Sequence, residues 1–149
     1  MKIIILCGGQ GTRIRDVADN VPKPMIPVGG LPILWHIMKY YAHWGHRDFI
    51  LCLGYKGQAI KDFFLNYEAH TRDFSIHLGA HKSIEYHTDH EESDWRVTLA
   101  DTGLDALTGA RIRRIRKYVG DDENFMLTYG DGLGDVNLDQ LVTFHRAHG

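Results

Sequence analysis

The chain has 149 residues, of which 44 % are apolar, and a formal net charge of −2 from 17 basic and 19 acidic side chains. This length and apolar content predict a single domain with a buried core and exclude a disordered chain. The small net charge argues against a general nucleic-acid or anionic-membrane surface, and no apolar run reaches the roughly 20 residues of a membrane helix. Cys7 and Cys52 both lie in apolar runs, so we expect buried free thiols in the reducing cytoplasm.

The chain begins with a run that is apolar on both faces, Lys2 to Cys7. Such a run predicts a strand inside a sheet that helices cover on both sides. A glycine loop, residues 8–13, follows directly. Lys23 then stands between Pro22 and Pro24, which restrict the backbone around it, so we expect Lys23 on a stiff arm.

Beyond this arm, the apolar spacing alternates between strand and helix periods. The pattern predicts a helix from Pro32 to Gly45, a strand at 49–53, a helix over 60–67, strands at 74–78, 83–87 and 95–100, a helix over 112–119, a strand at 125–129 and a last helix from Leu138. Strands and helices that alternate with short loops indicate a doubly wound α/β fold.

The glycine loop has the composition of a phosphate-binding loop. Glycines let backbone N–H groups approach phosphate oxygens without interference from a Cβ atom. The loop is neither a P-loop nor a dinucleotide fingerprint, because the spacings of both are absent. Gly8-Gly9 alone is equally typical of a plain turn. Arg13 and Lys23 favour a phosphate-binding loop, because a plain turn does not need a pair of cations whereas a bound polyphosphate does.

A second candidate site follows the predicted strand at 125–129. Ligands in open α/β sheets bind beyond the carboxyl ends of the strands, which is where Gly130-Asp131-Gly132 lies. An aspartate there suits Mg²⁺, which binds few carboxylates together with substrate phosphates. Taken alone, the same tripeptide is about twice as typical of an ordinary turn.

These motifs, in this order, resemble the signature of the sugar-phosphate nucleotidyltransferases. The resemblance is carried by the run Leu6-Cys7-Gly8-Gly9-Gln10-Gly11-Thr12-Arg13, by Pro22-Lys23-Pro24-Met25 and by Gly130-Asp131-Gly132. Longer segments resemble the branch that makes CDP-glucose, the glucose-1-phosphate cytidylyltransferases: 32–38, 54–57, 97–99, 101–103, 108–109 with Arg111, and 128–132.

The resemblance covers the whole chain and implies a Rossmann-like, three-layer, doubly wound mixed sheet of the nucleotide-diphospho-sugar transferase type. It also implies that residues 1–149 are the nucleotide-binding part of a longer domain. The sugar-binding part and a second metal-binding aspartate would then lie outside this chain, so we expect the chain alone to be inactive. The full-length enzyme is expected to be a homo-oligomer.

The implied reaction transfers CMP from CTP to glucose 1-phosphate and releases pyrophosphate, with Mg²⁺ as cofactor. By similarity, Arg13 stabilises the pyrophosphate leaving group, Lys23 contacts the phosphates, and Asp131 holds Mg²⁺. The nucleotide-binding positions implied by similarity are Leu6, Cys7, Gly8, Gly9, Gln10, Gly11, Thr12, Arg13, Lys23, Thr108, Arg111 and Gly130.

The sequence departs from the family pattern at three positions. Cys7 and Ala110 replace the usual alanine and glycine, and Ala106 stands where a polar residue is common. The changes at 106 and 110 bear on CTP binding and base choice, so a transferase for another nucleotide or sugar 1-phosphate stays open. The missing second aspartate keeps open a nucleotide-binding module without catalysis.

Two further patterns favour structural roles. His81, His87 and His90 lack the spacing of a zinc motif, which favours surface roles. The basic run Arg111–Lys117 is more typical of a solvated helix face than of an RNA-binding helix. We therefore expect neither nucleic acid nor a membrane as a partner.

Overall fold

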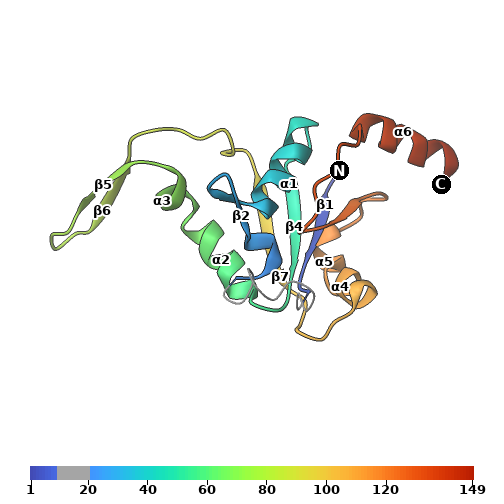
Figure 1. Ribbon diagram of the computed structural model, residues 1–149, viewed down its shortest axis with the longest axis horizontal. Helices are drawn as coiled ribbons and strands as arrows, with labels where there is room; N and C mark the ends of the chain where they lie inside the picture. The colour runs from blue at the N-terminus through green and yellow to red at the C-terminus, as the bar shows by residue number, and fades with distance from the viewer. Residues whose placement is uncertain (10–20) are drawn as a thin grey trace.

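The centre of the molecule is a four-stranded parallel sheet in the order β7-β4-β1-β8, with helices on both faces (Figure 1). The computed structural model describes residues 1–9 and 21–149. Its strands are β1 (Ile3–Cys7), β2 (Pro27–Val28), β3 (Leu31–Pro32), β4 (Asp48–Leu53), β5 (Phe74–His77), β6 (Ser83–Tyr86), β7 (Arg96–Asp101) and β8 (Met126–Tyr129). Its helices are η1 (Lys23–Met25), α1 (Ile33–His43), α2 (Gly57–Leu65), α3 (Tyr67–Thr71), α4 (Thr108–Arg114), α5 (Arg116–Val119) and α6 (Leu138–His148).

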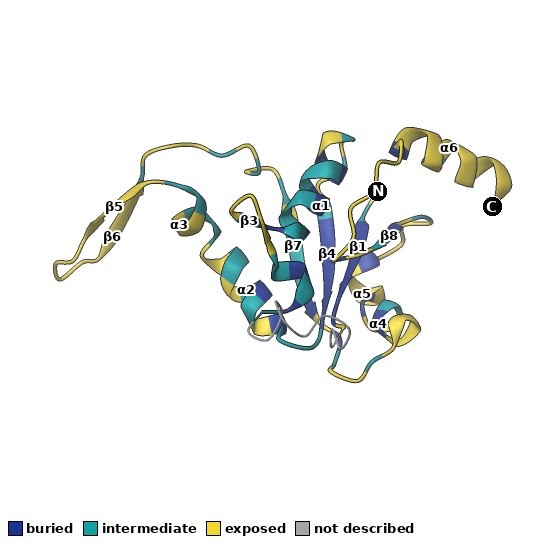
Figure 2. Ribbon diagram, in the orientation of Figure 1, coloured by how far each residue is buried: buried dark blue, intermediate teal, exposed yellow. Residues whose placement is uncertain are grey.

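The two faces of β1 form two separate apolar cores, as its continuous apolar run predicts. Ile3 and Ile5 belong to the core beneath α1 and α2, whereas Ile4 and Leu6 belong to the core that includes Ile115 and Val119. Figure 2 shows that the buried residues concentrate in β1 and β4, the two inner strands. The expected three-layer α/β fold is confirmed.

Antiparallel pairing in the described residues is confined to two small sheets, β2 with β3 and β5 with β6. The four central strands are all parallel, so their carboxyl ends meet at one edge of the sheet. No helix among the described residues is long and apolar enough to cross a membrane.

Two predicted helices are each divided in the structure. The helix expected over 60–67 ends at Leu65, and α3 begins at Tyr67. Between them, the Asn66 side-chain amide donates to the Asp62 carbonyl oxygen at 2.9 Å, the kind of local bond that competes with regular helix. The helix expected over 112–119 is likewise divided into α4 and α5 at the buried Ile115.

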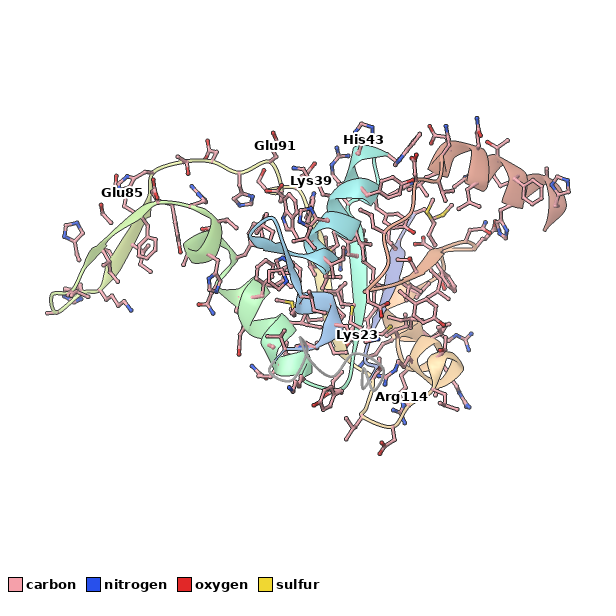
Figure 3. All side chains as sticks on the ribbon, viewed as in Figure 1. Lys23, Lys39, His43, Glu85, Glu91 and Arg114 are labelled. Atoms are coloured by element: carbon pink, nitrogen blue, oxygen red, sulfur yellow. The ribbon has the colours of Figure 1, made fainter. Side chains whose placement is uncertain are left out.

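The polar segment before β7 is fastened to α1 by one lysine. Lys39 Nζ donates to Glu92 Oε1 at 2.6 Å and to Glu91 Oε2 at 2.7 Å, and Figure 3 shows Lys39 and Glu91 close together beside α1. The Glu92 side chain is only 9 % exposed, whereas that of Glu91 is 86 % exposed. Burial alone would raise the pKa of Glu92, but the hydrogen bond and charge of Lys39 outweigh it and the pKa is lowered.

We therefore predict that Glu92→Gln destabilises the fold in a pH-dependent way. A lowered pKa in the folded state stabilises the fold above the ordinary glutamate pKa, and this stabilisation is lost as the pH falls through the folded value. The variant should lose about 1 kcal/mol of unfolding free energy at neutral pH, and the difference should shrink below about pH 4. Urea unfolding across pH measures it.

Glu91→Gln is the matched control, because the same lysine contacts a carboxylate that is mostly in water. Its effect should be clearly smaller. Equal losses in both variants, or a loss from Glu92→Gln that is independent of pH, would contradict the assignment.

Candidate functional site

The carboxyl edge of the parallel sheet contains a cavity of about 400 Å³. The segments that line it come from the end of β1, the arm around η1, the start of α4 with the residues before it, and the end of β8. The lining residues are Leu6, Cys7, Gly8, Gly9, Lys23, Pro24, Ala106, Leu107, Thr108, Arg111, Tyr129 and Asp131. This is the edge where open α/β sheets bind their ligands.

Arg111 closes one wall of the cavity and is buried, with only 6 % of its surface exposed. Its Nη1 donates to Leu53 O, Thr102 Oγ1 and Gly103 O at 3.0, 2.7 and 2.8 Å. Its Nη2 donates to Gly8 O and Leu104 O at 3.0 and 3.2 Å. One guanidinium thus joins the ends of β1 and β4 to the loop that follows β7.

The partners given above are all neutral oxygens, so the positive charge of Arg111 stays uncompensated by them. A buried charge that is solvated by neutral dipoles still projects its field into the adjoining cavity. The sequence predicted a solvated basic face over 111–117. That prediction is wrong for Arg111, although Arg113 and Lys117 in the same run are exposed.

Two glycines are required by this guanidinium. A Cβ atom on Gly8 would lie 2.2 Å from Arg111 Nη1, and one on Gly54 would lie 2.6 Å from the same atom. Both contacts are shorter than any side chain tolerates, and the arginine that would have to move is held by five hydrogen bonds. Gly8 therefore makes room for the Arg111 guanidinium, in addition to the close backbone approach to phosphate that the sequence predicts.

The proline-flanked arm brings a lysine opposite the predicted metal ligand. Lys23 Nζ lies 3.8 Å from Asp131 Oδ2, and both side chains line the cavity. Gly130 permits this approach, because a Cβ atom there would lie 2.9 Å from Cys7 Sγ and 3.1 Å from Pro24 Cγ. Figure 3 shows Lys23 at the carboxyl end of the central sheet.

Both cysteines are free and buried, as expected. Burial raises the pKa of the Cys7 thiol well above its usual range, and the nearby Cys52 and Asp131 act in the same direction. Burial also raises the pKa of Cys52, to about 11. Because the thiolate is the reactive form, Cys7 lines the cavity as a small apolar side chain and is no nucleophile there.

Most of the predicted site residues converge on this one cavity. Leu6, Cys7, Gly8, Gly9, Lys23, Thr108, Arg111 and Asp131 line it, and Gly130 lies directly behind it. Gln10, Gly11, Thr12 and Arg13 lie outside the described residues. Their assignments, like the ligand roles of the others, stay predictions.

Four lining residues were not among the predicted site residues: Pro24, Ala106, Leu107 and Tyr129. Three of them had a signal, because Pro24 flanks Lys23, Ala106 departs from the family pattern, and Tyr129 is the last residue of a strand that ends at the predicted ligand edge. Leu107 had none, because its side chain is 81 % exposed and follows no apolar period.

Asp131 is the carboxylate that lines the cavity in the described part of the chain. Residues 1–9 and 21–149 contain no group of three or more His, Cys, Asp or Glu side chains arranged to hold a metal ion. The described residues of the cavity therefore offer a cation one carboxylate. This suits an ion that takes most of its ligands from phosphates and water.

Comparison with known proteins places these features in context. A family model described as nucleotidyl transferase matches residues 2–149. The chain is 49 % identical over its whole length to the glucose-1-phosphate cytidylyltransferase of Salmonella typhimurium and 45 % identical to the probable glucose-1-phosphate cytidylyltransferase of Bacillus subtilis. In both alignments the chain spans 57 % of the relative's length.

A solved structure with a similar fold is HddC from Yersinia pseudotuberculosis complexed with GMP-PN. It aligns with a TM-score of 0.69 at 23 % sequence identity, over 96 % of this chain and 53 % of that one. At this identity the likeness concerns the fold alone.

The hydrogen bonds of Arg111 predict that Arg111→Lys is strongly destabilising even though it keeps the charge. A lysine cannot reproduce the planar fork, so buried carbonyl oxygens would lose their partner. We expect a loss of about 3 kcal/mol in unfolding free energy, measured by urea denaturation.

Arg113→Lys is the matched control, on the same helix but exposed to solvent. It should change stability by less than about 0.5 kcal/mol. If the two variants are equally stable, Arg111 does not join the strand ends in solution.

Proposed function

The chain belongs to the nucleotidyl transferase family, and we propose that it is the nucleotide-binding part of an enzyme that transfers CMP from CTP to glucose 1-phosphate. The observation that carries this proposal is the cavity at the carboxyl edge. There Gly8 and Gly9, the cationic side chains of Lys23 and Arg111, and the Asp131 carboxylate meet around one space. The choice of CTP and glucose 1-phosphate is supported by the cytidylyltransferase relatives, of which the chain spans only 57 %.

The chemistry needs positive charge and positioning more than a base. A phosphate oxygen of glucose 1-phosphate is already an anion and can attack the α-phosphorus of CTP directly. The new O–P bond forms while the bond to the bridging oxygen breaks, and its electron pair leaves with pyrophosphate. Because two polyanions repel each other, catalysis depends on holding them in line and on stabilising the developing charge.

The described residues can meet these two needs. Lys23 is a compact point charge on a restrained arm, close enough to Asp131 to exchange that partner for a phosphate oxygen. Arg111 adds a fixed positive potential from the wall. The backbone of Gly8 and Gly9 borders the same space, and by resemblance Arg13 would stabilise the leaving pyrophosphate.

Mg²⁺ is proposed as the cofactor, since one cavity carboxylate fits an ion that binds chiefly phosphates. Asp131 would hold it, and when bound the ion would neutralise charge on the phosphate oxygens. A second carboxylate is proposed from outside the 149 residues. The enzyme is proposed to work in the cytoplasm as a homo-oligomer, without nucleic acid or a membrane as partner.

A second function, nucleotide binding without turnover, is favoured for this chain alone, because the described residues place a single carboxylate in the cavity. Calorimetry with CTP and Mg²⁺, together with an assay of pyrophosphate release, distinguishes the two. For the full-length protein we predict that pyrophosphate release requires CTP, glucose 1-phosphate and Mg²⁺ together.

Three results would change this assignment. Binding without any release would support the binding module. A much faster reaction with UTP or dTTP would reject the cytidylyl assignment while keeping the nucleotidyltransferase chemistry. No nucleotide binding by either form of the protein would reject both functions.

Lys23→Met should separate phosphate stabilisation from folding in the full-length enzyme. Removing one cation from the reacting phosphates should lower kcat by roughly 100-fold to 1,000-fold, with unfolding free energy little changed because Lys23 is on the cavity surface. Lys117→Met, an exposed lysine on α5, is the control and should keep full activity. Normal turnover by Lys23→Met would remove Lys23 from the mechanism.

A further inference from the structure

The side-chain hydroxyl of Thr102 is buried against the Arg111 guanidinium. Thr102 directly follows β7 and is only 1 % exposed. Its Oγ1 donates to Leu53 O at 2.6 Å and accepts from Arg111 Nη1 at 2.7 Å. The other four oxygens that accept from this guanidinium are backbone carbonyls. Among the described residues, Thr102 therefore supplies the one side-chain acceptor of these five.

Arg111 Nη1 has more acceptors than hydrogens. A terminal guanidinium nitrogen carries two hydrogens, and three oxygens, those of Leu53, Thr102 and Gly103, lie 2.7 to 3.0 Å from Nη1. If the Thr102 hydroxyl is removed, Nη1 keeps two carbonyl acceptors. Leu53 O also keeps two donors, Arg111 Nη1 and the Thr102 backbone N–H at 3.0 Å. The loss of this hydroxyl therefore leaves no partner of the pair without a hydrogen bond.

The hydroxyl determines the position of the guanidinium instead. Because Oγ1 gives its single hydrogen to Leu53 O, its lone pairs are available to Nη1. Its contact with Nη1 is also the shortest of the five, at 2.7 Å against 2.8 to 3.2 Å for the carbonyls. Without the hydroxyl, Nη1 can move between the two carbonyls that remain.

The turn that carries Thr102 is held by contacts that do not involve Arg111. Gly103 N donates to Asp101 Oδ1 at 3.0 Å. Arg114 Nη1 donates to the Thr102 carbonyl oxygen, and Figure 3 shows Arg114 at the end of the molecule where Lys23 also lies. The turn thus presents the Thr102 hydroxyl to the guanidinium from a point that other residues fix.

We propose that Thr102 is a positioning residue whose hydroxyl sets the place of the Arg111 guanidinium in the cavity wall, and with it the affinity for the nucleotide. Arg111 lines the cavity and Thr102 does not, so Thr102 acts through the arginine. This inference rests on the proposed function, in which the fixed charge of Arg111 acts on the nucleotide. A charge that is in place before binding spares the ligand the cost of ordering it.

A pair of variants isolates the hydroxyl. Thr102→Ala and Thr102→Ser both lose the threonine methyl group and differ from each other by one oxygen atom. In protein labelled with ¹⁵N, the guanidinium N–H resonances of Arg111 report its hydrogen bonds without any substrate. Thr102→Ala should shift these resonances and speed their exchange with water, whereas Thr102→Ser should keep them close to those of the parent.

Thr71→Ala is the matched control. Thr71 Oγ1 also donates to a backbone carbonyl oxygen, that of Tyr67 at 2.7 Å, but it belongs to α3, which contributes no residue to the cavity lining. This variant should leave the Arg111 resonances and the kinetics unchanged.

Kinetics of the full-length enzyme test the consequence for the nucleotide. Thr102→Ala should raise KM for CTP about tenfold and keep kcat within about twofold, because a displaced wall charge weakens ground-state and transition-state binding alike. KM for glucose 1-phosphate should not change, and Thr102→Ser should restore KM for CTP. A merely structural loss would instead lower the folded fraction and act on both substrates.

Three outcomes would overturn the proposal. Unchanged Arg111 resonances in Thr102→Ala would show that the hydroxyl does not place the guanidinium. Shifted resonances with an unchanged KM for CTP would show that this placement does not set nucleotide affinity. A much lower urea midpoint for Thr102→Ala than for Thr102→Ser would show that the hydroxyl is needed for stability rather than for position.

Failure of the proposed function gives a different result. The parent enzyme itself would then release no pyrophosphate from CTP and glucose 1-phosphate, which rejects the link to nucleotide affinity. The resonances of the two Thr102 variants would still decide whether the hydroxyl places Arg111.

Discussion

The candidate site depends on one buried guanidinium. Taking a charged group out of water is costly, and the cost is offset in Arg111 by five hydrogen bonds to oxygens that cannot follow it if it moves. These oxygens belong to the ends of β1 and β4 and to the loop after β7. The parallel sheet fixes the spacing of the strands along their length, and Arg111 fixes it where they end.

The same constraint gives the cavity its electrostatic character. Because the five acceptors are neutral, the site has a built-in positive wall before any ligand arrives. Across the cavity, Lys23 and Asp131 lie 3.8 Å apart and balance each other. An incoming polyphosphate would meet one cation held by five hydrogen bonds and a second cation whose partner is the Asp131 carboxylate. Charges that are in place before the reaction stabilise developing charge without the cost of reorganisation.

Much of this was predictable from the sequence, and the failures share one cause. The strands at 49–53 and 125–129, the order of the motifs and their meeting at one edge follow from apolar periods and from the geometry of parallel sheets. The burial of Arg111 did not follow, because the run 111–117 looks uniformly basic and only tertiary structure separates one arginine from its neighbours. The steric requirement at Gly8 did not follow either, since the atom that its Cβ would strike belongs to a residue 103 positions away along the chain.

The hairpin of β5 and β6 illustrates a different limit of sequence-based prediction. The alternation Phe74-Ser75-Ile76-His77-Leu78 correctly predicted a strand, but an apolar period cannot say what covers the apolar face. In β1, one face is covered by α1 and α2, and the other packs against Ile115 and Val119, far away along the chain. In the β5–β6 hairpin, strand β6 has the same alternation, and the described residues leave the shared apolar face largely uncovered. Two strands alone gain little stability from packing against each other, so an isolated hairpin is marginally stable at best in water. The β5–β6 hairpin and the cavity are built from different elements, so the exposed face of the hairpin lies apart from the strand ends that Arg111 holds.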